Sequence, residues 1–261
     1  MSFVLLALIA IPIGWVASMI GVGGGIFMVP LLTLLYVPTT QIAVGTSLAA
    51  IVFNSLSSTF SYARQRVIQL SLAMMILPGA AVGAWLGAYL TDFISSGMLA
   101  LAFGVVMLYS AGIMLWGKAP KDLAAKFQKK SEDGNSRPHW LFVLIVGLLA
   151  GLASGFFGIG GGIVMVPAMT ILLGVDIVPA VATSLFVMGP ISLVGVAQHA
   201  FLGNVRLEFA APLAIGIVIG AQLGAYTTTR VPQLFLRRLF GIVLLYSAIN
   251  MILKGLTPPP S

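Results

Sequence analysis

Two glycine-rich segments are the parts of this sequence best suited to binding chemistry. One reads GVGGGIFMVP at residues 21–30, and nearly the same string, GIGGGIVMVP, returns at 158–167. Glycine lets the chain turn sharply and leaves backbone amides uncovered. Where such a turn opens a helix, the amides and the positive end of the helix dipole favour a negatively charged ligand. The candidate anion-binding residues are Gly23, Gly24, Gly25, Gly160, Gly161 and Gly162.

Nucleotide binding and helix packing are alternative roles for glycine clusters. A dinucleotide-binding loop needs a strand before it and a βαβ unit around it, and neither copy has that context. Small residues can also serve close helix packing, which is the role we expect where glycines are spaced by four. Three consecutive glycines are poor helix formers and need another reason to exist. The glycines assigned to packing are Gly79, Gly83, Gly87, Gly216, Gly220 and Gly224.

Hydroxyl groups inside long apolar segments are the next candidates, because polar side chains are costly in lipid and are usually functional. The pair Thr46 and Ser47 recurs as Thr183 and Ser184. We expect these four residues near the middle of the membrane as donors to the anion. A hydroxyl bonded to a carbonyl of its own helix is the alternative.

Amide and imidazole groups extend the candidate site. Asn54 lies on the same apolar segment as Thr46, and Gln198 and His199 lie on its counterpart. His199 could bind the anion when protonated or relay a proton, which is the one route to proton coupling that the spans offer. A hydrogen-bonded structural histidine near a helix end is the alternative.

Three arginines flank these segments. Arg64, Arg66 and Arg206 could attract or gate an anion through paired N–H groups. For Arg64 and Arg66 an ordinary cytoplasmic anchor is the alternative, since arginine is common at the inner membrane surface.

The remaining residue types argue against catalysis. The chain has no cysteine, and its six carboxylates fall in loops or at predicted helix ends. A membrane-embedded enzyme would need paired acid–base groups or metal ligands within the spans, and one histidine does not supply them. We therefore expect no enzyme activity, no metal and no cofactor.

The elements that must position these residues are membrane helices. The chain of 261 residues is 59% hydrophobic and only 7% charged, against about 25% charged residues in an ordinary globular domain. Its apolar stretches are continuous, which favours helices over strands. In the first half we predict them at 3–20, 26–36, 42–62, 68–90 and 97–116. The second spans only half a bilayer as a helix, so we expect the glycine turn at membrane depth.

The chain is duplicated with an offset of 137 residues. This offset pairs Gly21 with Gly158, GAWLGAY at 83 with GAQLGAY at 220, and FGVVMLYSA at 103 with FGIVLLYSA at 240. We predict an all-α polytopic protein of about 8 to 10 membrane segments, built from two repeats at 1–117 and 140–261.

Charge placement addresses the orientation of the repeats. The chain has a net charge of +7, and six of its 13 basic residues lie with three acidic ones in a hydrophilic linker, 118–139, which we expect to be cytoplasmic rather than nucleic-acid binding. If each half crosses five times, counting the hairpin as two, only Arg206 and Lys254 lie outside. If each half crosses four times, Arg230, Arg237 and Arg238 lie outside instead. The first arrangement is inverted and is favoured.

The motifs also resemble a known family. The string GVGGGIFMVPLL with GTSL, followed by GFFGIGGGIVMVP with ATSL, on a chain with a hydrophilic middle, is similar to the TauE/SafE family of sulfite exporter-like permeases. The resemblance covers nearly the whole chain. It implies transport of sulfur-containing anions such as sulfite or sulfoacetate across the bacterial inner membrane, commonly outward. Thiosulfate-uptake relatives are implied to depend on cysteines, so that mode is not expected here.

These observations predict a secondary carrier of a small anion that works by alternating access, with membrane lipids as its surroundings. A passive anion channel is the alternative, because the same donors could line a pore. The sequence leaves the exact substrate, the coupling ion and the oligomeric state open.

Overall fold

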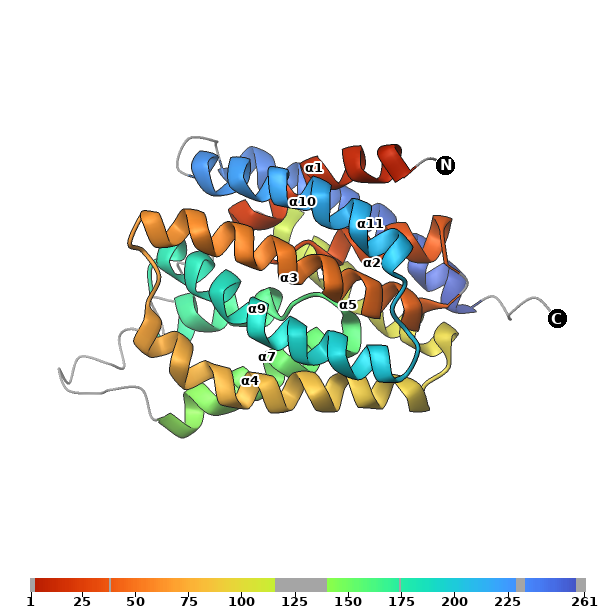
Figure 1. The fold of residues 1–261 in the computed structure, drawn as a ribbon, viewed down its shortest axis with the longest axis horizontal. Coiled ribbons are helices and arrows are strands. Elements are labelled where there is room, and N and C mark those ends of the chain that lie inside the picture. The colour runs from red at the N-terminus through yellow and green to blue at the C-terminus, as the bar shows by residue number, and fades with distance from the viewer. Residues whose placement is uncertain (1–2, 38, 116–139, 174, 229–232, 257–261) are drawn as a thin grey trace.

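The computed structural model describes residues 3–37, 39–115, 140–173, 175–228 and 233–256 (Figure 1). Every element among them is helical. The first half contains α1 (Phe3–Ile20), α2 (Gly25–Leu35), α3 (Thr40–Arg64), α4 (Leu70–Leu90), the 3-10 turn η1 (Thr91–Phe93) and α5 (Ser96–Leu115). The second half contains α7 (Trp140–Phe157), α8 (Gly162–Pro167), the π-helical segment η2 (Ala168–Leu172), α9 (Ile177–Phe201), α10 (Leu207–Thr227) and α11 (Gln233–Leu256).

The predicted fold class is confirmed. Each of the five apolar stretches of the first half forms one helix, with ends within a few residues of the predicted ones. The short element after the first glycine cluster is α2, and α8 together with η2 covers the equivalent residues in the second half. The predicted linker 118–139 and Arg230 lie outside the described residues, as do the side chains of Arg237 and Arg238.

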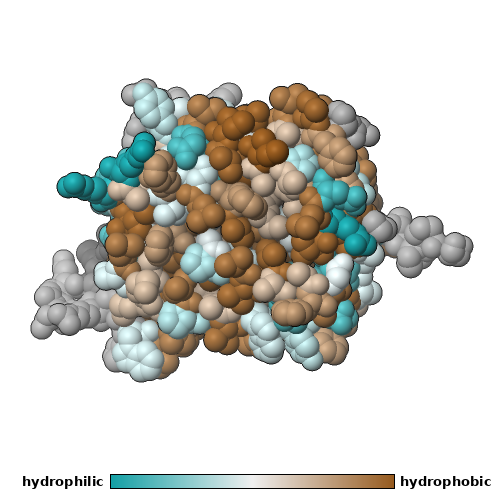
Figure 2. Space-filling model, viewed as in Figure 1, coloured by the Kyte–Doolittle hydropathy of each residue, from teal (hydrophilic) through white to brown (hydrophobic). Residues whose placement is uncertain are grey.

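Six described helices are long and apolar enough to cross a membrane. They are α1, α3, α4 together with η1, α7, α9 and α10. Large apolar side chains such as Phe53, Leu56 and Trp85 are exposed on the outside of the bundle, and apolar residues cover much of the face in Figure 2. Such a surface suits contact with lipid chains rather than water.

The two halves interlock. Helix α1 packs against α10, α4 against α7, α5 against α11 and α3 against α9, so each of these joints unites one helix from either half. Figure 1 shows α3 and α9 crossing the middle of the molecule, between α10 above and α4 below.

Glycines make the closest of these joints. A β-carbon at Gly83 of α4 would collide with the carbonyl oxygen of Leu148, and one at Gly220 of α10 would collide with that of Ile11. These positions are equivalent under the 137 offset, as are their partners. The glycines one turn before and after them make the same kind of contact, which is the packing role predicted for this set.

Helices α3 and α9 run antiparallel at the centre. Leu48 lies against Gly195, whereas Ser55, further along α3, lies against Gly189, earlier in α9. Because α3 and α9 are equivalent helices, this contact pairs the same helix of the two halves in opposite directions. Both glycine turns pack against this central pair.

Candidate functional site

Both glycine turns are buried inside the bundle. The first connects α1 to α2, and its Gly21, Gly23 and Gly24 have φ angles of 79°, 79° and 89°. The second repeats this backbone with φ angles of 68°, 76° and 78° at Gly158, Gly160 and Gly161. Residues with a β-carbon rarely adopt these angles. The turns therefore require glycine for backbone reasons alone, whatever they bind.

The first amides of the two short helices have no hydrogen-bond partner among the described residues. In the first copy Phe27 and Met28 donate to the carbonyl of Gly24, both at 3.1 Å, but the amides of Gly25 and Ile26 form no hydrogen bond with described residues. In the second copy Val164 and Met165 donate to Gly161 at 3.1 and 3.0 Å in the same way. A helix start with uncovered donors is the arrangement that attracts an anion.

The two turns hold one another. Ser47 donates to the carbonyl of Gly158 at 3.0 Å, and Ser184 donates to that of Gly21 at 3.1 Å. Each turn is thus bonded by the third helix of the opposite half. The same carbonyls lie so close to Gly162 and Gly25 that a β-carbon at either would collide with the opposite turn. We call this pair of crossing turns, 21–25 and 158–162, the glycine crossing.

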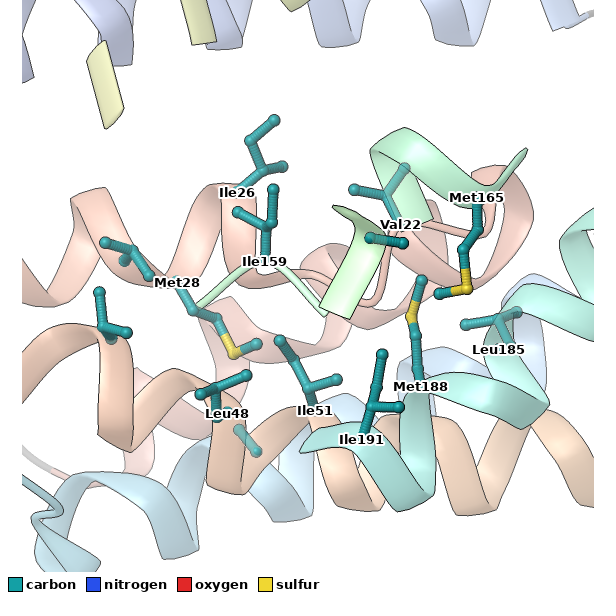
Figure 3. Packing of buried hydrophobic residues seen from close by; sticks show 14 of the residues in the cluster. Val22, Ile26, Met28, Leu48, Ile51, Ile159, Met165, Leu185, Met188 and Ile191 are labelled. Carbon is teal, nitrogen blue, oxygen red and sulfur yellow. The ribbon is translucent and has the colours of Figure 1, made fainter. Parts of the chain in front are cut away.

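Ile51 and Met188 cover the glycine crossing. They are equivalent under the offset, and both are fully buried. A β-carbon at Gly23 would lie 2.8 Å from Met188 Sδ and 3.3 Å from Ile51 Cγ2, and one at Gly160 would lie 3.2 Å from each. Figure 3 shows both side chains extending toward the turns among Val22 and Ile159. In this conformation apolar groups lie beside the unpaired amides.

The predicted hydroxyl donors have partners within the protein. Thr46 accepts from the amide of Arg206 at 3.1 Å, and Thr183 accepts from that of Gln69 at 3.0 Å, so both threonines hold the loop after the opposite third helix. Ser47 and Ser184 also donate to carbonyls of their own helices, at 2.8 Å each. Their contact with a substrate stays a prediction.

His199 has an equivalent bond in the first half. Its Nε2 lies 3.0 Å from the carbonyl of Gly155, and Tyr62, at the equivalent position, donates to the carbonyl of Ser18 at 3.0 Å. Both bonds join the end of a third helix to the end of a first helix. His199 Nδ1 is buried with no partner among the described residues, and neighbouring Gln198 is half-buried.

Asn54 is fully buried on α3. Its Oδ1 accepts from Ser18 at 3.1 Å, whereas its Nδ2 has no partner among the described residues. Ser154 and Ser192, on the second-half side, likewise have buried hydroxyls without a described partner.

The predicted arginines lie away from the glycine crossing. Arg64, Arg66 and Arg206 are exposed near the ends of α3 and α9. The Arg64 guanidinium lies 4.2 Å from the centre of the Phe60 ring, and Arg66 has a φ angle of 57° in the turn after α3. The structure thus brings the six candidate glycines and the serines together, and it leaves the arginines at the rim.

Ile51 and Met188 were not predicted as site residues because they are apolar. Their equivalence under the 137 offset, at the centre of the two third helices, was the signal that could have identified them. Among the described residues, no group of three or more His, Cys, Asp or Glu is placed to hold a metal ion.

The helical fold, the membrane-length helices and the two turns buried between them define a polytopic membrane protein. Residues 6–251 match the model of the family described as sulfite exporter TauE/SafE. The chain belongs to this family.

Its relatives are named as transporters. A probable membrane transporter protein of Bacillus subtilis, YunE, is 32% identical over 98% of this chain and 99% of its own length. Another from the same organism, YdhB, is 30% identical over 89% of this chain and 93% of its own. A probable membrane transporter protein of Methanocaldococcus jannaschii is 27% identical over 95% of both chains. No solved structure matches the chain. The family and the names of these relatives place the chain in a class of membrane transporters.

Proposed function

We propose that this protein is a secondary carrier that exports small sulfur-containing oxyanions, such as sulfite or sulfoacetate, across the bacterial inner membrane. The observation that carries the proposal is the glycine crossing, where two helix starts with unpaired amides lie inside the bundle. Lipid cannot satisfy such groups, so irregular backbone at this depth needs a protein partner or a ligand. An anion accepts from several amides at once and is stabilised by both helix dipoles.

The proposed carrier alternates between two faces by moving one half against the other. The antiparallel contact of α3 with α9, two equivalent helices, supports repeats of inverted topology. Inverted repeats give a transporter the same local structure on both sides of a central site. With this topology the linker 118–139 is cytoplasmic, and the fully buried glycine crossing is the fixed point between the two faces.

Access to the amides would require a movement of Met188 and Ile51. Both side chains touch both turns, so an anion must displace at least one of them. Methionine is unbranched and changes shape easily, whereas the branched Ile51 is stiff at its first side-chain torsion. Met188 is therefore the proposed gate, and Ile51 is the wall against which it closes.

Counterflow in vesicles tests the proposal. Purified protein is reconstituted into liposomes loaded with unlabelled sulfite or sulfoacetate, and uptake of the labelled anion is followed. Saturable uptake that is accelerated by internal anion supports a carrier. Flux that internal anion does not accelerate supports a passive channel instead, and the absence of both overturns the proposed function.

Substitutions test the amides themselves. Gly24→Ala and Gly161→Ala place a β-carbon at a left-handed residue, and we expect weaker anion binding in protein that still folds. Because these variants also strain the turn, Met188→Ala is the second test. It removes the side chain beside both turns without touching the backbone, and we expect faster anion entry. Unchanged affinity and transport in all three folded variants would refute the role of the amides.

A further inference from the structure

One side of the glycine crossing carries a polar cluster that the other side lacks. Its members are all buried and lie where α1, α3 and the end of α10 meet. They are Ser18, Asn54, Ser58, Tyr62 and Thr228. We call this set the polar cluster.

The cluster is a chain of hydrogen bonds. Ser18 donates to Asn54 Oδ1 at 3.1 Å, and its hydroxyl lies 2.7 Å from that of Ser58. Because a hydroxyl has one proton, the Ser58 hydroxyl is the donor in the second bond. Tyr62 donates to the carbonyl of Ser18, and its oxygen lies 2.8 Å from that of Thr228. The Asn54 carbonyl is therefore held by Ser18, whose hydroxyl in turn accepts from Ser58.

The Asn54 amide nitrogen is the group that the cluster leaves unsatisfied. It is fully buried and has no partner among the described residues. A serine can turn its proton to a carbonyl of its own helix, but an NH2 group held by its carbonyl cannot do so. Leaving such a donor unpaired in the membrane interior is costly. An acceptor is expected beside it when the protein functions.

The helix face that carries Asn54 also carries Ile51, which covers the glycine crossing. Asn54 lies three residues after Ile51, which would be 3.3 Å from a β-carbon at Gly23, and residues three apart lie on the same helix face about 5 Å apart. On the neighbouring helix, Ser18 follows Ala17, whose β-carbon would be 3.4 Å from one at Gly24. Asn54 therefore lies one helical turn from a residue that touches both glycine turns.

The equivalent place in the second half has different chemistry. The 137 offset replaces Ser18, Asn54 and Ser58 by Gly155, Ile191 and Gly195. Those residues provide no side-chain hydrogen bond. Asn54 is thus replaced by the apolar Ile191 on the second-half side, where the buried polar groups without a described partner are those of Ser154, Ser192 and His199.

We propose that Asn54 donates directly to an oxygen of the transported anion, and that Ser18 and Ser58 orient its amide for this contact. This inference rests on the proposed function and makes the binding site asymmetric. The ligand class that fits is a compact sulfur oxyanion with several acceptor oxygens, one facing Asn54 and others facing the glycine amides. The neutral amide selects the anion by hydrogen bonding, and no lysine or arginine is buried among the described side chains.

The test compares Asn54→Leu with two matched controls by titration calorimetry of the purified protein with sodium sulfite and sodium sulfoacetate. Asn54→Leu is expected to weaken binding by about 10- to 100-fold, as for loss of a hydrogen bond to a charged group. Asn250→Leu removes an amide that bonds to its own helix at Tyr246, and Gln41→Leu removes an amide near the start of α3 that bonds to the carbonyl of Ile94. Both controls should bind within about twofold of the unchanged protein.

A second variant keeps the test decisive if Asn54→Leu fails to fold. Ser18→Ala leaves the amide in place but removes the group that holds it, and we expect binding about 3- to 10-fold weaker. Anion should also raise the melting temperature of the unchanged protein more than that of either variant, because ligand binding stabilises the folded state.

The outcomes separate the two proposals. If the unchanged protein neither binds nor exchanges these anions, the proposed function fails. If the unchanged protein binds these anions but Asn54→Leu binds them within twofold as tightly, the inference about Asn54 fails while the proposed function stands. Where Asn54→Leu does not fold, binding by Ser18→Ala within twofold of the unchanged protein has the same meaning. The Asn54 amide then bonds to water and has only a structural role.

Discussion

The two serine bonds of the glycine crossing give a quantitative test of the arrangement. Ser47→Ala would leave the carbonyl of Gly158 without its partner in the bundle interior, and Ser184→Ala would do the same to that of Gly21. An unpaired buried carbonyl costs about 1–3 kcal/mol. Each serine also shares its proton with its own helix, so we expect about 1–2 kcal/mol for each variant.

We expect Ser47→Ala and Ser184→Ala to lower the free energy of unfolding equally. The two bonds are equivalent and nearly equal in length, at 3.0 and 3.1 Å. The two variants should therefore lose the same free energy of unfolding within about 0.5 kcal/mol. Reversible denaturant unfolding in mixed micelles, followed by tryptophan fluorescence, measures both. Ser71→Ala, at an exposed position of α4, is the control and should change stability by less than about 0.5 kcal/mol.

Two results would refute this reasoning. One is a loss in both variants no greater than in Ser71→Ala, which would mean that the serines do not hold the opposite turns. The other is a difference above about 1.5 kcal/mol between the two variants, which would mean that the two bonds are not equivalent in the folded protein.

Three further predictions concern contacts between helices and loops outside the glycine crossing. Gly151→Ala should destabilise the protein by about 1–3 kcal/mol, because its β-carbon would collide with the carbonyl of Ala80. The control Gly112→Ala has no atom within 4 Å of the new carbon and should be neutral or slightly stabilising in the same unfolding assay. Equal losses of stability in the two variants would contradict the close packing of α4 on α7. Thr46→Val should cost about 1 kcal/mol and speed hydrogen exchange at the amide of Arg206, whose acceptor it removes, and unchanged exchange there would contradict the bond. Lys254→Met should speed hydrogen exchange near the end of α2, since Lys254 donates to the carbonyl of Thr33, with Lys254→Arg as the control that keeps a donor.

Much of the fold could be predicted because each membrane helix corresponds to a long apolar segment of the sequence. The first predicted helix has the bounds of α1, and the others of the first half differ by only a few residues. The offset of 137 residues also predicted that the second glycine cluster would begin a second short helix. What it could not predict is that this helix is interrupted, with α8 ending at Pro167 and a π-helical segment following, because that depends on local packing.

The candidate site was harder to predict, since a sequence reveals polarity and duplication rather than contact. Thr46 looked like a ligand because it is polar and repeated, yet its hydroxyl accepts from the loop at Arg206. Met188 is apolar and gives no polar signal in the sequence, yet it covers both turns. The importance of Ser18 depends on its neighbours across two helices, which no spacing in one segment reveals. Asn54 was identified because an amide in an apolar helix is rare, and its unpaired nitrogen supports that choice.

The unequal build of the two short helices has a mechanical consequence. Helix α2 is continuous from Gly25 to Leu35 and is tied near its end to α11 through Lys254. Its counterpart changes from α to π geometry after six residues, and π segments interrupt the regular bonding that stiffens a helix. We therefore expect the second hairpin to be the more compliant of the two. Although the two halves are nearly equivalent, the second hairpin would then move before the first. The steps of the transport cycle would therefore follow a fixed order.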